Sequence, residues 1–280
     1  MIIAIFYNES KNASRSVAID VCRFLASFNV KVVSDDHKAA EIGALPISGV
    51  DPKEIDFMLS LGGDGTILRV LHSHPEIEAP LIGINLGGLG FMADVPLTDI
   101  YASLQDLLNG SYQIQKRIVM EGKASNGDAC FAVNDIVVHR AQIPSLVDLA
   151  MYVDGSYLNT FSADGLIVAT PGGSTAYSLA AGGPIITPEV NALVITPISP
   201  HTISNRPIVL MPKEEIRIQY LSENKPVEVT FDGISSFSMA TGEVFRIKLS
   251  PKTFRSVLLT RHNYFSTLRT KLGWAGKLRV

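Results

Sequence analysis

The junction between a predicted buried strand and a predicted helix at residues 55–71 constrains the fold most. The apolar run at 55–61 follows a proline and is typical of a strand buried inside a parallel sheet. Apolar residues at 67–71 then recur at the spacing of a helix. Three glycines and one carboxylate lie between the two elements, at Gly62, Gly63, Asp64 and Gly65. The segment therefore predicts a strand that turns through glycines directly into a helix.

The same junction has the composition of a phosphate site. Glycine has no Cβ, so this loop can take positive φ and bring its N–H groups close to phosphate oxygens. Thr66 can cap the helix or bind a phosphate at the positive end of the helix dipole. Asp64 does not suit passive anion binding, because phosphate repels a carboxylate unless the carboxylate holds a metal ion or accepts a proton from an attacking hydroxyl. The loop predicts a phosphate site with its own base, and a tight turn with a capping aspartate is the structural alternative.

Composition narrows the class of protein. With 46% hydrophobic and 18% charged residues among 280, the chain is too apolar to be disordered and can bury one or two cores. A net charge of −3 argues against a large nucleic-acid surface, so we expect no nucleic-acid partner. Cys22 and Cys130 lie in apolar surroundings and are predicted to be buried thiols of a reducing compartment. No signal peptide or membrane-length apolar run is present, which predicts a cytoplasmic protein without a membrane partner.

The first third of the chain alternates strand and helix signals. Strands are expected at 2–6, 30–33, 55–61 and 81–85, with helices at 14–28 and after Thr66. Thr98 is expected to cap a further helix that Gly110 ends. This alternation predicts an open α/β domain with a parallel, Rossmann-like sheet, whose ligands bind beyond the C-terminal ends of the strands.

After Gly110 the pattern changes to short apolar runs separated by turn residues, which predicts a β-rich domain. The expected strands lie at 132–139, 149–153, 165–169, 208–210, 215–220, 227–231 and 244–249. From Thr260 the spacing becomes helical again, and this tail is expected to pack back on the first domain. We therefore predict an α/β domain at 1–105 with 258–280, and a β-rich domain at 106–257.

Polar and glycine-rich segments in the β-rich part are further candidates for a site. At 164–184 a predicted strand is followed by a Gly-Gly-Ser-Thr turn and a helix of small residues. The hydroxyl groups of this segment can hydrogen-bond a ribose or an amide of a ligand at the helix N-terminus. The alternative is a helix whose small residues serve packing alone. Asn134 and Asp135 interrupt an apolar strand, so they need backbone partners or a ligand. His201 is interpreted as a hydrogen-bonded loop residue, and the other histidines show no metal-ligand spacing.

Together, these motifs resemble the NAD kinase family over nearly the whole chain. The resemblance is carried by residues 62–66, 83–85, 89–91, 134–135, 164–184, 200–202, 204–207, 231–233 and 271–274. The Gly-Gly-Asp-Gly-Thr element is shared with phosphofructokinases and with diacylglycerol- and sphingosine-type lipid kinases. The Thr-Pro-x-Gly-Ser-Thr-Ala-Tyr-Ser element is much more specific to NAD kinases.

The resemblance implies that a phosphoryl group passes from ATP or polyphosphate to the 2′-hydroxyl of the adenosine ribose of NAD, giving NADP. Asp64 is then the base, and Gly62, Gly63, Gly65 and Thr66 hold donor phosphates that Mg²⁺ shields, without a fixed metal site in the protein. The implied NAD contacts are Asp64, Gly65, Arg69, Asn134, Asp135, Asp164, Thr175, Ala176, Tyr177, Ser178, Leu179 and Ala180. For Arg69 a solvated helix face is the alternative. A homodimer or homotetramer is also implied.

Three positions depart from the family pattern. Asp135 replaces a frequent Glu and is shorter by one methylene. Ser162 replaces a frequent Arg, which weakens the expected contact with a ligand phosphate, and Ile234 replaces a frequent Gln and removes an amide donor. Gly172 occupies the variable third position of its motif and removes no reactive group. These departures affect the expectation that the protein binds NADP more than the expectation that it binds NAD.

Two alternatives come from other classes of protein. A lipid kinase would share the first glycine loop but should lack the Ser-Thr-Ala-Tyr segment and the Asn-Asp pair. A dinucleotide sensor without catalysis would keep the pocket and lack the base, whereas Asp64 is present. Stabilisation of the protein by NAD, NADPH or lipid headgroups distinguishes these alternatives.

Overall fold

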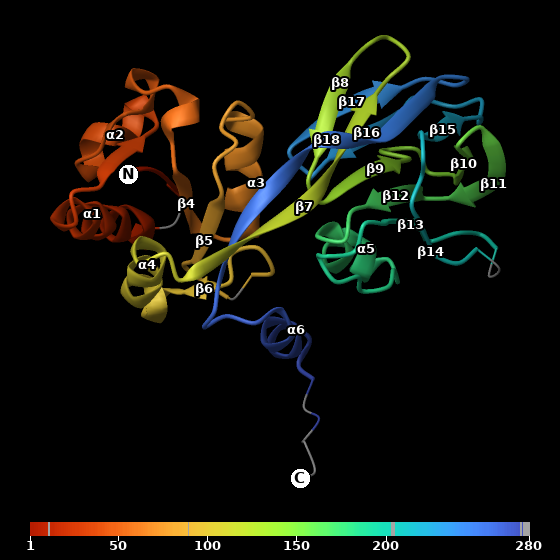
Figure 1. The fold of residues 1–280 in the computed structure, drawn as a ribbon. Coiled ribbons are helices and arrows are strands. Elements are labelled where there is room, and N and C mark those ends of the chain that lie inside the picture. Colours follow the sequence, from red (N-terminus) through yellow and green to blue (C-terminus); the bar gives the residue numbers. More distant parts are fainter. Residues whose placement is uncertain (11, 89, 203–204, 275, 277–280) are drawn as a thin grey trace. The chain divides into compact units, whose positions relative to one another are not determined.

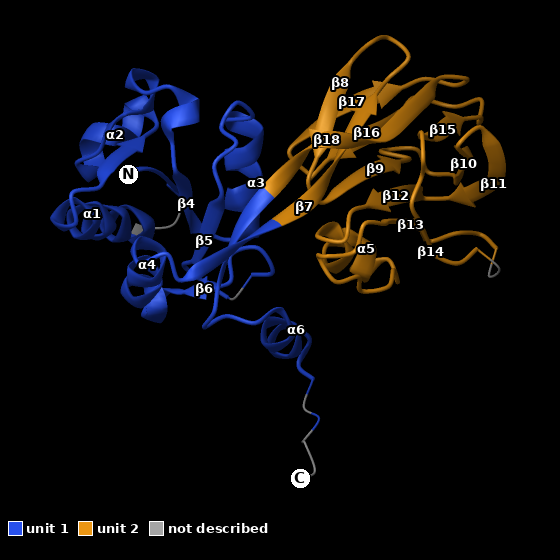
Figure 2. Ribbon diagram, viewed as in Figure 1, with its two compact units in different colours: residues 1–115, 255–280 blue, residues 116–254 orange. Residues whose placement is uncertain are grey.

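The computed structural model describes the chain apart from residues 11, 89, 203–204, 275 and 277–280 (Figure 1). It contains two compact units, the first formed by residues 1–115 and 255–280 and the second by residues 116–254 (Figure 2). The chain leaves unit 1 within strand β7 (Tyr112–Lys123) and returns within strand β18 (Val244–Leu259). These limits differ from the predicted ranges because they fall inside two long strands, not in loops.

Unit 1 is built on a parallel sheet, as the alternation of strand and helix signals predicts. Its strands are β1 (Ile2–Tyr7), β2 (Lys31–Ser34), β3 (Leu45–Pro46), β4 (Phe57–Gly62), β5 (Leu81–Asn85) and β6 (Val95–Pro96). The order runs β5-β4-β1-β2-β3, with β6 beside β5 and every pair parallel. Gly62 is paired with Asn85, so the glycine loop after β4 and the segment after β5 leave the same edge of the sheet.

The helices of unit 1 are α1 (Asn12–Ser27), α2 (Asp36–Ile42), α3 (Asp64–Ser73), α4 (Ile100–Leu108) and α6 (Tyr264–Leu272), with short 3-10 turns η1 (Ile47–Gly49), η2 (Pro52–Glu54) and η3 (Leu97–Asp99). Residues of α1, α2 and α4 pack with the strands in an apolar core. Leu25 of α1 and Leu104 of α4 are fully buried in one cluster with Leu59 of β4. Helix α6 belongs to unit 1, which agrees with the expected return of the tail.

The start of α4 differs from the prediction. Thr98 lies in η3, where its hydroxyl donates to Asp99 Oδ1 at 3.1 Å, and Asp99 occupies the N-cap position without a side-chain capping bond. Thr98 therefore does not cap α4, because the extra 3-10 turn moves the helix start by one residue. Gly110 ends the helix as predicted, with a φ of 75° that glycine adopts at low cost.

Unit 2 contains antiparallel sheets that share a core. Its strands are the greater part of β7 and of β18 together with β8 (Ala129–Ala132), β9 (Asp135–His139), β10 (Val147–Val153), β11 (Ser156–Ala163), β12 (Gly165–Ala169), β13 (Leu193–Ile198), β14 (Ile208–Leu210), β15 (Ile216–Tyr220), β16 (Val227–Phe231) and β17 (Ser235–Met239). One sheet has the order β14-β13-β12-β9-β16-β17, and the order β11-β10-β15-β18 forms part of the other. The β-rich prediction is confirmed, although β7, β11, β13, β17 and all but the last residue of β8 lie outside the expected strands.

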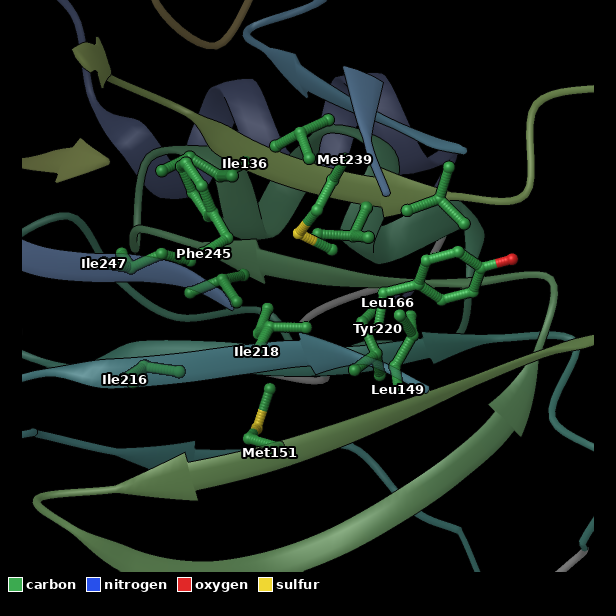
Figure 3. Packing of buried hydrophobic residues seen from close by; sticks show 14 of the residues in the cluster. Ile136, Leu149, Met151, Leu166, Ile216, Ile218, Tyr220, Met239, Phe245 and Ile247 are labelled. Carbon is green, nitrogen blue, oxygen red and sulfur yellow. The ribbon is translucent and has the colours of Figure 1, made fainter. Parts of the chain in front are cut away.

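The core of unit 2 is filled from both sheets (Figure 3). Ile136 and Leu166 belong to β9 and β12, whereas Ile218, Tyr220 and Phe245 belong to β15 and β18. All five are fully buried in one cluster. Burial of this apolar surface provides most of the driving force for folding of the unit and anchors the strand ends that carry the polar candidates. Among the described helices, none is long and apolar enough to cross a membrane.

Candidate functional site

The glycine loop of unit 1 has the predicted strand-to-helix geometry. Gly62 is the last residue of β4, Gly63 is the N-cap and Asp64 is the first residue of α3. The N–H of Gly63 donates to the buried Thr66 hydroxyl at 3.4 Å, so Thr66 ties the loop to the first turn. A Cβ at Gly62 would overlap the Thr66 side chain. Glycine is therefore required there for space.

The Asp64 carboxylate is fixed by the segment that follows β5. Its Oδ2 accepts the N–H of Phe91 at 2.9 Å, and its Oδ1 accepts those of Met92 and Ala93 at 3.0 and 2.8 Å. A Cβ at Gly90 would overlap Oδ1. This residue was predicted as the base, but its backbone partners could not be identified from the sequence, because they lie 27 to 29 positions away.

This arrangement leaves part of the hydrogen-bonding capacity of the Asp64 carboxylate unused. An ionised carboxylate offers about four lone-pair directions. The backbone occupies two at Oδ1 and one at Oδ2, so one direction at Oδ2 remains for a hydroxyl donor. The three bonds also fix the orientation of the carboxylate before any ligand arrives, which is the condition for efficient general-base action.

A pocket of about 280 Å³ adjoins the loop within unit 1. Thr66 and Arg69 line it from α3, and Tyr7 and Asn8 line it from the end of β1. Arg69 is exposed and, in the part of the chain that the structure describes, has no acidic ion-pair partner. Its guanidinium is thus a cation beside a concave surface, which suits an anionic ligand.

The pocket also contains a charged pair. His74 Nε2 lies 2.9 Å from Asp35 Oδ1, and Lys38 Nζ lies 3.5 Å from Asp35 Oδ2. The hydrogen bond with Asp35 raises the pKa of His74, and the same bond lowers the pKa of Asp35. The pair stabilises the pocket wall at the end of α3.

In unit 2, Asn134 and Asp135 lie at the start of a strand. The prediction of one strand over 132–139 was wrong, since β8 ends at Ala132 and β9 begins at Asp135. The break arises because the Asp232 carboxylate takes the N–H groups of Val133, Asn134 and Asp135 at 2.9, 2.7 and 3.1 Å. A side chain thus replaces the ladder partners that a continuous strand would use.

The loop after β12 binds the carbonyl groups of the same segment. Thr170 donates its N–H to Asn134 O at 2.8 Å and its hydroxyl to Val133 O at 2.6 Å. A Cβ at Gly173 would overlap the Asn134 carbonyl. The Asn-Asp pair and the Thr-Pro-Gly-Gly-Ser-Thr loop, both singled out from the sequence, therefore form one structure.

The side chains of the pair have unusual properties. Asn134 is 8% exposed, and its Oδ1 has no hydrogen-bond partner among the described residues. Burial raises the pKa of Asp135 to about 7, with a further contribution from the charge of Asp232. Near neutral pH this carboxyl group can therefore accept or donate a hydrogen bond, and Asn134 offers an unused acceptor.

Two hydroxyls of the segment after Gly173, those of Ser174 and Ser178, are internal. Its predicted helix is reduced to a 3-10 turn, η4 (Gly173–Thr175), and a single turn, α5 (Tyr177–Ala180). Ser174 donates to Pro171 O at 2.6 Å, and Ser178 Oγ lies 2.8 Å from Thr196 Oγ1, both fully buried. Tyr177 is exposed. NAD contacts at Thr175, Ala176, Tyr177, Ser178, Leu179 and Ala180 stay predictions.

Asp164 has a protein partner that the sequence did not indicate. Its Oδ1 accepts from Arg140 Nε at 2.6 Å, and the same guanidinium donates to Ile143 O. Ser162, where the family often has Arg, donates its hydroxyl to Asp148. Among the described residues, no group of three His, Cys, Asp or Glu side chains could hold a metal ion.

Comparisons with known proteins agree over both units. The ATP-NAD kinase N-terminal domain model matches residues 3–112, and the ATP-NAD kinase C-terminal domain model matches residues 133–259. A curated NAD kinase of Protochlamydia amoebophila is 59% identical over 99% of this chain and all of its own, and one of Moorella thermoacetica is 38% identical over 98% and 90%.

Two solved structures have the same fold. Yeast NADH kinase complexed with NADH has a TM-score of 0.85 at 27% identity, covering all of this chain and 89% of its own. An NAD kinase from Archaeoglobus fulgidus in complex with ATP has a TM-score of 0.77 at 26% identity, covering 99% and 100%.

Proposed function

The chain belongs to the NAD kinase family, which phosphorylates NAD to NADP, and we propose that Asp64 is its catalytic base. The proposal is supported above all by the Asp64 carboxylate, which three backbone N–H groups orient beside the glycine loop. Its free Oδ2 direction accepts the proton of the adenosine 2′-hydroxyl as the oxygen attacks the terminal phosphorus of the donor. The bond between this phosphorus and the oxygen that bridges it to the rest of the donor breaks, and the shortened donor leaves with the electron pair of that bond as a negative charge.

ATP is the donor that we propose for the glycine loop, since the Archaeoglobus fulgidus relative is described in complex with ATP. In this proposal its phosphates are assigned to the loop of Gly62, Gly63, Gly65 and Thr66, and a phosphate bound by Gly63 would replace the bond that this N–H makes to the Thr66 hydroxyl. Arg69, a cation beside the adjoining pocket, also suits phosphate oxygens. Mg²⁺ enters as part of the donor, because phosphate oxygens and water are its preferred ligands. Inorganic polyphosphate offers the same phosphate oxygens and is the alternative donor.

NAD is assigned to unit 2 in this proposal, supported by the yeast relative described with NADH. Asn134 Oδ1 is a buried acceptor without a partner among the described residues, and an amino group of the dinucleotide would satisfy it. Asp135 can donate or accept beside it, since burial raises its pKa to about 7. Unit 1 thus serves as the domain of the glycine loop and unit 2 as the NAD-binding domain.

The test is NADP formation from NAD and Mg²⁺ with either ATP or polyphosphate. Asp64→Asn should keep NAD binding and lose roughly two to four orders of magnitude in turnover, the usual span for a lost acid-base group. The amide oxygen can still accept the N–H groups of Met92 and Ala93, so only the Phe91 bond is lost. Retention of most activity would remove Asp64 from the base role.

Asp154→Asn is a matched control in the same assay. Asp154 also accepts three successive backbone N–H groups, from Lys213, Glu214 and Glu215, in an exposed turn of unit 2. Its substitution removes the same kind of bond without touching the glycine loop, so turnover should stay at the wild-type level. If wild-type protein binds NAD but forms no NADP with either donor, the sensor reading is favoured instead.

We further propose that the protein acts in the cytoplasm as a homodimer or homotetramer, as the family resemblance implies. Sedimentation velocity of the purified chain tests the oligomer. A single monomeric species at assay concentration would exclude it.

A further inference from the structure

We infer that Asp232 is a positioning residue for NAD binding, which sets the backbone of Val133, Asn134 and Asp135 so that the side chains of Asn134 and Asp135 are presented to the dinucleotide. The inference deepens the proposed function and rests on it. Asp232 is far from this segment in sequence, 97 to 99 residues away, and the resemblance to NAD kinases gave it no role.

The contact is reciprocal and well defined. Asp232 Oδ1 accepts the N–H groups of Asn134 and Asp135 at 2.7 and 3.1 Å, and Oδ2 accepts that of Val133 at 2.9 Å. In return, the N–H of Asp232 donates to Asp135 O at 3.0 Å. The pairing of β16 with β9 extends to Phe231 and Ile136. Asp232 therefore supplies hydrogen bonds to this segment at the point where the regular pairing of β16 with β9 ends.

The turn after β16 directs the Asp232 carboxylate toward the N–H groups of residues 133–135. Asp232 and Gly233 have φ values of 51° and 63°, in the left-handed region. Aspartate tolerates this conformation better than most residues. The turn returns the chain into β17, where Phe231 is paired with Ser235. The Asp232 side chain thereby reaches the three N–H groups from the end of its own strand.

Asp232 and Thr170 hold opposite groups of the same segment. The N–H groups of 133–135 are bound to Asp232, while the carbonyls of Val133 and Asn134 are bound to Thr170. The segment is buried, so unpaired N–H groups there would be costly. The side-chain oxygen of Asn134 is the acceptor that remains without a partner among the described residues. A segment with bound backbone and one unused side-chain acceptor is pre-organised for a ligand.

Asp154 distinguishes positioning from mere stabilisation of a turn. It has a similar φ of 48° and accepts three successive N–H groups at 3.0, 2.8 and 3.2 Å in the same unit. The residues that it holds, Lys213 to Glu215, are not candidates for the site. Asp154→Asn therefore reports what the loss of such a contact does to folding alone.

The experiment compares three proteins, Asp232→Asn, Asp154→Asn and wild type. For each protein, calorimetry gives the Kd for NAD, steady-state kinetics give KM and kcat, and thermal unfolding gives the midpoint. Asp232→Asn should raise Kd and KM for NAD about tenfold, equivalent to about 1.4 kcal/mol, with kcat and the KM for ATP within about threefold. Asp154→Asn should lower the thermal midpoint but leave the NAD constants unchanged. Equal NAD constants in both variants, or a loss confined to kcat, would overturn the inference.

A double-mutant cycle with Asn134→Ala adds an independent readout. If Asp232 acts through the Asn134 side chain, Asp232→Asn should weaken NAD binding less in the Asn134→Ala background than in wild type. Strict additivity would overturn the inference. If Asp232→Asn does not fold, Asp232→Glu, which keeps the charge but displaces the segment, should show the same rise in KM for NAD. Wild-type protein that fails to bind NAD would instead overturn the proposed function, and the inference with it.

Discussion

At the scale of single residues, the space around the Asp64 carboxylate is as important as its chemistry. Gly90 lies so close that a Cβ there would overlap Oδ1, whereas a Cβ at Gly88 would meet nothing within 4 Å. Gly90→Ala should therefore displace the carboxylate and lower kcat by about tenfold or more, since small misplacements of a catalytic group are costly. Gly88→Ala is the matched control and should retain wild-type kcat. Steady-state kinetics on both variants check this, and equal kcat values would contradict the packing argument.

The pKa of Asp135 predicts a specific dependence of stability on pH. Burial raises this pKa to about 7, so between the unfolded value and pH 7 the folded state binds more protons than the unfolded state. Its contribution to stability therefore falls as pH rises through that range. Asp135→Asn removes this titrating group. As pH rises from 4 to 8, the free energy of unfolding of the variant should therefore increase by roughly 2 to 4 kcal/mol relative to that of wild type. Urea unfolding of both proteins measures it, and parallel pH profiles would refute it.

At the scale of elements, the pair formed by Asp35 and His74 joins the end of α3 to the start of α2. The raised pKa of His74 means that its stabilisation is present below the unfolded pKa and is lost as pH rises through the folded value. Asp35→Asn should therefore cost more free energy of unfolding at pH 6, about 1.5 to 3 kcal/mol for a charge-assisted bond, than at pH 9. Chemical denaturation at the two pH values tests this. An equal cost at both would show that the pair acts without its charge.

Element prediction succeeded where the signal was local and failed where it was not. Strands β1, β4 and β5 were anticipated within two residues because each is an apolar run between turn residues. The break before β9 was missed, because Asp232, far along the chain, supplies the hydrogen bonds there. Strand β11 was missed because it is half exposed and its polar residues carry no clear alternation.

At the scale of the whole molecule, the family assignment predicts which ligand stabilises the fold. NAD at about 100 times its dissociation constant should add roughly 2.7 kcal/mol to the stability of the native state. Diacylglycerol and sphingosine headgroup analogues should add nothing. Thermal unfolding with each ligand measures the difference. Stabilisation by the headgroups alone would contradict the assignment.

The sequence by itself determined the parallel α/β region, the β-rich region and the family, because these depend on short-range periodicity and on glycines at fixed positions. The tertiary structure decided how the candidate residues are held. Asp64 finds its three N–H partners on the segment after β5, and Asp232 finds its partners on the segment before β9. Local backbone preferences do not specify such pairs; they form only when packing of the core closes long loops. The raised pKa of Asp135 likewise follows from burial, which the folded chain alone defines.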